Sequence, residues 1–169
     1  MPKKVLVLGA GLVSRPLIRY LLEHGFQLTC ADIVVEKAEE RLDGHPNGRA
    51  VPLDVEDADS LSELVAECDV AVSLLPWTMH PKVAKVCLQL GKHMATTSYI
   101  SDTMRALNDE AAAADLLFLN ECGVDPGIDH MTAMRIFDDV WARKGRVEVF
   151  ESYCGGLPAP QDVNRLGYK

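Results

Sequence analysis

Short runs of Val and Leu alternate along the chain with longer segments whose apolar residues recur at helical spacing. The run at residues 4–8 ends at Gly9, and a helical pattern with Leu17, Ile18 and Leu21 follows before Gly25. Repeated β-α units of this length predict an α/β fold, with a doubly wound parallel sheet covered by helices on both faces. The same alternation predicts further strands at 27–33, 50–53, 69–75, 93–96, 116–119 and 147–153, and helices at 36–42, 57–67, 81–90, 101–114 and 128–143.

A glycine-rich turn lies between the first predicted strand and the first predicted helix. Gly9 would permit the tight turn, and Gly11 would let backbone N–H groups approach a pyrophosphate at the helix N-terminus. Ser14 replaces the usual third glycine and is small enough to keep helix and strand close. Two glycines alone are a weak signal, but their place between strand and helix favours a Rossmann-like dinucleotide-binding domain.

Asp32 ends the second predicted strand, 21 residues after Gly11. This is near the spacing of a carboxylate that accepts hydrogen bonds from ribose hydroxyls. Such a carboxylate would repel a 2′-phosphate, so it favours NAD over NADP as the cofactor. Two other interpretations stay open, namely a solvated aspartate at a strand end and the similar first turn of S-adenosylmethionine enzymes.

The charge and composition of the chain exclude some classes of function. The chain has 17 Lys and Arg against 25 Asp and Glu, a net charge of −8, which argues against nucleic-acid binding. No apolar run reaches the roughly 20 residues that span a membrane. The cysteines lack metal-ligand or redox spacing, so we expect no metal and a reduced, cytoplasmic location. We expect Cys30, Cys68, Cys87 and Cys122 to be buried, and Cys154, between Tyr153 and two glycines, to be a cleft thiol.

Several segments together resemble the saccharopine dehydrogenase (saccharopine reductase) family of the L-glutamate-forming type. They are GAGLVSRPL, SLLPWTMHPKVAKVC, TTSYISDTM and NECGVDPGIDHM, followed by ESYCGGLPAP. The resemblance covers essentially the whole chain and is to the N-terminal portion of the family. It implies an oxidoreductase of lysine metabolism that acts on the CH–NH bond of saccharopine. The products would be L-glutamate and 2-aminoadipate 6-semialdehyde, with NAD(P) as cofactor and general acid–base groups for the proton transfers.

The same resemblance assigns residues to the cofactor. It places the glycine turn at the pyrophosphate, Asp32 at the adenosine ribose and Asp54 beside the adenine. The leucines before Pro76 are equally consistent with ordinary core positions. The implied cofactor-binding residues are Gly9, Gly11, Leu12, Val13, Ser14, Asp32, Asp54, Val55, Leu74, Leu75, Pro76 and Thr97.

For the chemistry, the resemblance implies that Ser98, Tyr99 and Asp125 bind substrate and that Tyr99, Asp125 and Cys154 are catalytic. Alternatives remain for each position. Ser98 and Tyr99 could form a polar turn, Asp125 or Asp129 could cap the following helix, and Cys154 could be a packed thiol. We expect His130 to be structural.

The regular alternation of strand and helix patterns is interrupted in the segment CGVDPGID, which predicts a domain boundary. We expect a dinucleotide-binding domain over residues 1–125. Residues 126–169 would form a linker helix and the first strand of a second α/β substrate domain that is incomplete and inactive on its own. The partner is a small amino-acid substrate, and a homodimer is left open. Two other functions also remain open: a related imine reductase, such as carboxynorspermidine dehydrogenase, and a non-catalytic NAD(P)-sensing protein.

Overall fold

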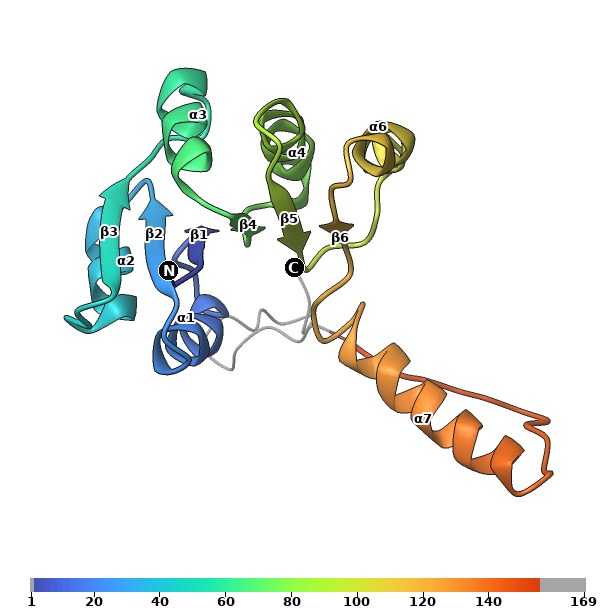
Figure 1. Ribbon diagram of the computed structural model, residues 1–169. Coiled ribbons are helices and arrows are strands. Elements are labelled where there is room, and N and C mark those ends of the chain that lie inside the picture. Colours follow the sequence, from blue (N-terminus) through green and yellow to red (C-terminus); the bar gives the residue numbers. More distant parts are fainter. Residues whose placement is uncertain (1, 156–169) are drawn as a thin grey trace, which may run out of the picture.

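The computed structural model describes residues 2–155 and confirms the predicted doubly wound sheet. Its six strands all run parallel, in the order β3-β2-β1-β4-β5-β6. Helices α1 and α2 cover one face of the sheet, and α3, α4 and α6 cover the other (Figure 1). The strands are β1 (Lys4–Leu8), β2 (Gln27–Asp32), β3 (Gly48–Pro52), β4 (Val70–Ser73), β5 (His93–Thr96) and β6 (Phe118–Leu119). The helices are α1 (Ser14–Glu23), α2 (Val35–Leu42), α3 (Ala58–Glu67), η1 (Trp77–Met79), α4 (His80–Gln89), α5 (Asp102–Arg105), α6 (Asn108–Ala113) and α7 (Ile128–Ala142).

The central strand β1 is buried on both faces, as its uninterrupted apolar sequence predicts. Successive side chains of a strand point to opposite faces. Val5 and Val7 therefore pack with Ile18 of α1, whereas Leu6 and Leu8 pack with the residues of α3 and α4. The alternation divides the core into two layers, one on each face of the sheet. These layers hold the carboxyl end of β1 in place.

The strand order reverses beside β1, because β2 lies on one side of it and β4 on the other. Open α/β sheets bind ligands at such a point, outside the carboxyl ends of the strands. Gly9, directly after β1, has a φ of +99°, and a Cβ there would lie 3.1 Å from the Leu74 carbonyl oxygen. Only glycine allows the ends of β1 and β4 to come this close without strain.

Two predicted elements are shorter than expected. The predicted helix at 101–114 divides into α5 and α6, and the second begins at Asn108, a residue type that favours helix starts over helix interiors. The predicted strand at 116–119 shrinks to β6, since it is the last strand of the sheet and pairs with β5 alone. The other predicted elements of the sheet domain differ from the observed ones by one or two residues at their ends.

The predicted strand at 147–153 is wrong. This segment has no regular secondary structure and runs back along α7, which extends away from the sheet (Figure 1). Phe150 contacts Phe137 of α7 edge to face, with ring centroids 4.9 Å apart, while Val149 is 79% exposed. No strand lies beside it in the described part of the chain, and an isolated strand lacks partners for its backbone groups.

The cysteines follow the expectation with one exception. Cys30, Cys68 and Cys87 are buried free thiols, and burial raises the pKa of each. Cys122 is exposed, contrary to the prediction, because it lies in the loop after β6, where its thiol donates to the carbonyl of Asn120. Within residues 2–155, no helix is long and apolar enough to cross a membrane.

Candidate active site at the carboxyl edge of the sheet

The glycine turn leads directly into α1. The Gly9 N–H donates to the Ala31 carbonyl at 2.8 Å, and the Ser14 hydroxyl donates to the Gly11 carbonyl at 2.8 Å. Ser14 is fully buried, in line with its expected role as the small third residue of the motif. Val13, the N-cap residue, offers no side-chain cap, and Leu12 before it is 92% exposed. The start of α1 is therefore open to an anion.

Asp32 connects the turn to the end of β2. Its Oδ2 accepts a hydrogen bond from the Ala10 N–H at 2.8 Å, and its Oδ1 accepts one from the Val34 N–H at 2.9 Å. The carboxylate is thus fixed rather than simply solvated. A carboxylate has about four acceptor positions, so Asp32 can still accept bonds from the hydroxyls of a bound ribose.

Arg41 is a neighbour of the turn that the sequence did not reveal. Its Nε donates to the Gly11 carbonyl at 3.4 Å, and its Nη1 contacts Glu40 at 2.7 Å. Arg41 lies in α2, 30 residues beyond Gly11, and no motif signals this contact. Its contact supports the glycine turn from the face of the sheet that α1 and α2 cover.

The remaining predicted cofactor residues lie along the same edge. Asp54 is exposed, and its Oδ1 accepts the Glu56 N–H at 2.9 Å, whereas Val55 is a buried core residue. Leu74 and Leu75 are half-buried and pack against opposite layers of the core. The core interpretation of both leucines is confirmed, and a cofactor contact at this edge stays a prediction.

A cavity of about 520 Å³ opens where the loops after β4, β5 and β6 meet. Four of the predicted residues line it together with Trp77 of η1, a residue of the segment SLLPWTMH for which no role was predicted. Trp77 is exposed and supplies an aromatic wall. The lining residues are Trp77, Thr97, Ser98, Tyr99, Ile100, Ser101, Asp125 and Pro126.

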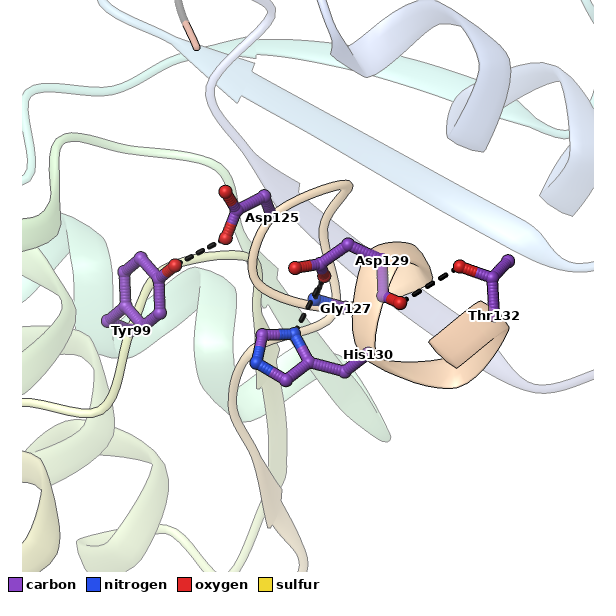
Figure 2. Close-up of polar contacts among 6 residues, drawn as sticks. All are labelled: Tyr99, Asp125, Gly127, Asp129, His130 and Thr132. Atoms are coloured by element: carbon purple, nitrogen blue, oxygen red, sulfur yellow. Dashed lines mark hydrogen bonds and ion pairs between the residues drawn. The ribbon is translucent and has the colours of Figure 1, made fainter. Parts of the chain in front are cut away.

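Asp125 is in contact with Tyr99, another of the predicted catalytic residues. The Tyr99 hydroxyl points at its carboxylate and donates a hydrogen bond to Oδ1 (Figure 2). This bond is the main reason that the pKa of Tyr99 rises to about 12. The Asp125 carboxylate also raises the pKa of the Cys154 thiol. Tyr99 and Cys154 therefore stay protonated near neutral pH, and Tyr99 directs its proton at the Asp125 carboxylate.

Gly127, and neither Asp125 nor Asp129, is the N-cap of the following helix; Asp129 lies in the first turn of that helix. Its Oδ1 accepts the Gly127 N–H at 2.9 Å and lies 2.7 Å from His130 Nδ1 (Figure 2). The hydrogen bond to Asp129 raises the pKa of His130. His130 is exposed and pairs with Asp129, so its expected structural role stays a prediction, and Asp125 lines the cavity. In the described residues, no group of His, Cys, Asp or Glu is arranged to hold a metal ion.

Comparison with known proteins decides the family. The family model described as saccharopine dehydrogenase NADP binding domain matches residues 5–119. A second model, described as saccharopine dehydrogenase C-terminal domain, matches residues 123–169. The chain belongs to the saccharopine dehydrogenase family. The resemblance drawn from the sequence segments is thereby confirmed.

Individual relatives agree with this assignment. Saccharopine dehydrogenase [NADP(+), L-glutamate-forming] of Schizosaccharomyces pombe is 43% identical over 98% of the chain. The alpha-aminoadipic semialdehyde synthase of Arabidopsis thaliana is 39% identical over the full chain. The solved apo structure of saccharopine dehydrogenase (L-Glu forming) from Saccharomyces cerevisiae has a TM-score of 0.83 and 40% identity over 99% of the chain and 38% of the yeast chain.

The chain spans 37% of the length of the S. pombe protein and 18% of the A. thaliana protein. The family description and the name of the S. pombe relative refer to NADP. They support a dinucleotide site but give no specific support to the NAD preference expected from Asp32.

Proposed function

We propose that this chain is the dinucleotide-binding part of an L-glutamate-forming saccharopine dehydrogenase. The observation that carries the proposal is the hydrogen bond between Tyr99 and Asp125 in the cavity wall, in a chain 43% identical to the S. pombe enzyme of that name. The reaction would oxidise the CH–NH bond of saccharopine and release L-glutamate and 2-aminoadipate 6-semialdehyde.

The residues fit a nicotinamide dinucleotide. The uncapped start of α1 would hold its pyrophosphate, and Asp32 would accept bonds from its adenosine ribose. When bound, the nicotinamide supplies the acceptor for the hydride that leaves the substrate carbon. The protein contributes binding, orientation and proton transfer around that step.

Asp125 would accept the proton that the reaction releases at the substrate nitrogen or at the attacking water. Proton transfer by a positioned side chain contributes on the order of 10²- to 10⁴-fold in rate. The protonated Tyr99 donates a hydrogen bond to the Asp125 carboxylate and so holds it in place at the cavity. The Ser98 hydroxyl, in the cavity wall, would hold a substrate carboxylate without adding charge.

We further propose that Asp32 gives the site a preference for NAD over NADP. The carboxylate is fixed at the end of β2 by two backbone N–H groups, so it cannot swing away from a 2′-phosphate without losing both bonds. A phosphate beside a fixed carboxylate is repelled. A protein that binds NADP at least as tightly as NAD would overturn this part of the proposal.

The proposed chemistry is tested by a pair of neighbouring charge removals in the full-length protein. Asp125→Asn keeps the shape of the side chain but removes the proton acceptor, so turnover of saccharopine should fall on the order of 10²-fold. Asp129→Asn removes an equal charge from the first turn of α7 and should leave turnover within a few-fold. Equal effects of the two variants, or turnover of carboxynorspermidine in place of saccharopine, would contradict the proposal.

A further inference from the structure

A buried imidazole lies directly behind the cavity wall. His80, the first residue of α4, is 2% exposed and makes hydrogen bonds with three hydroxyl groups. Its Nδ1 lies 2.9 Å from the Ser73 hydroxyl at the end of β4. Its Nε2 lies 2.9 Å from Thr96 at the end of β5 and 2.8 Å from Ser98. Neither Ser73 nor Thr96 is exposed, so Ser98 is the member of this cluster that lines the cavity.

The imidazole can hold its hydroxyl partners in two ways. Burial lowers the pKa of His80, which keeps the ring neutral, with one N–H donor and one acceptor nitrogen. With the proton on Nδ1, Nε2 accepts and can draw in the hydroxyl proton of Ser98. With the proton on Nε2, the Ser73 hydroxyl donates to Nδ1, and the oxygens of Ser98 and Thr96 share the Nε2–H donor. The Ser98 proton is then free to point into the cavity.

We propose that His80 is a positioning residue that turns the Ser98 hydroxyl toward the cavity, so that it donates to a carboxylate of the substrate. This inference rests on the proposed function, in which Ser98 holds a carboxylate of the substrate. A carboxylate only accepts hydrogen bonds, so the Ser98 hydroxyl must donate. The tautomer with the proton on Nε2 meets this need, and the hydroxyl of Ser73 can then donate to Nδ1. The relay runs from β4 through α4 to the loop after β5.

The test measures steady-state kinetics of the full-length protein with saccharopine and with the dinucleotide. His80→Leu removes the relay and should raise KM for saccharopine roughly 10-fold, the size of one lost hydrogen bond to a charged group. His80→Gln, whose amide can place an N–H near the position of Nε2, should recover most of this loss. Ser73→Ala should raise KM in the same direction, although Ser73 lies behind His80. KM for the dinucleotide should stay constant in all three variants.

Val83→Ala is the matched control, because Val83 is fully buried in the same helix and takes part in none of the hydrogen bonds of the relay. It should lower Tm and leave KM for saccharopine unchanged. If His80→Leu and Ser73→Ala lower Tm but keep KM within twofold of the wild-type value, His80 is a core residue and the inference is wrong. A wild-type protein without saccharopine turnover would instead overturn the proposed function.

Discussion

Replacement of Asp32 by Ala tests how the dinucleotide turn is built. The change leaves two backbone N–H groups without their acceptor, those of Ala10 and Val34. Ala10 is fully buried, whereas Val34 is exposed and its N–H can bind water. The Ala10 N–H therefore dominates the loss, which should amount to about 1–3 kcal/mol of unfolding free energy. In a chain of this size, such a loss lowers Tm by roughly 2–10 °C.

The same replacement should relax cofactor discrimination. Two unit charges 4 Å apart interact with about 1 kcal/mol in water and about 4 kcal/mol near a protein surface. Removing the Asp32 carboxylate should therefore improve the binding of NADP relative to NAD by about 5-fold to 10³-fold. Asp32→Asn separates the two effects, because it removes the charge but keeps one acceptor oxygen.

Calorimetric titration with NAD and with NADP, together with a thermal melt, measures both consequences. The control is Asp69→Ala, since Asp69 also accepts a backbone N–H, that of Lys4 at 2.8 Å, but at the opposite edge of the sheet. It should leave the ratio of the two dissociation constants unchanged. The reasoning fails if Asp32→Ala alters neither Tm nor that ratio, or if both variants alter the ratio equally.

Three further predictions concern the rest of the chain. Cys154→Ser should reduce saccharopine turnover less than Asp125→Asn does, since a hydroxyl can still donate to Asp125; an equal loss would give the thiol a larger role. Burial lowers the pKa of His80, so unfolding free energy should decline as pH falls below about 6.5, and His80→Gln should flatten this slope in acid melts. Gly127→Ala should cost about 1–3 kcal/mol in denaturant unfolding, because Gly127 has a φ of +144° and a Cβ would collide with the Gly123 carbonyl; Gly155→Ala, in open space, should cost little.

The sheet was predictable because its strands are marked locally. The apolar run of β1, the glycine after it and the aspartate at the end of β2 are all visible in the sequence, and each has a direct structural cause. The strand predicted at 147–153 failed for the opposite reason. Its β-branched residues favour a strand, but a strand also needs a neighbour, and the sequence pattern does not show whether one is present.

The site was predictable in part. The family resemblance pointed to Tyr99 and Asp125, and the structure places them in hydrogen-bond contact although 26 residues separate them. Nothing in the spacing alone predicts that contact. Arg41 and His80 were missed because their roles depend on where α2 and α4 pack against the sheet edge. A lone histidine in an apolar segment carries no signal of the hydroxyls that will surround it.

The most direct test of the central claim is product analysis with the full-length protein. Saccharopine is incubated with NAD or NADP, and reduced nicotinamide and free amino acids are measured in the same sample. One L-glutamate should appear for each nicotinamide reduced. Oxidation on the other side of the same nitrogen would release lysine instead, and lysine as the product, or no reduction with either cofactor, would contradict the proposed function.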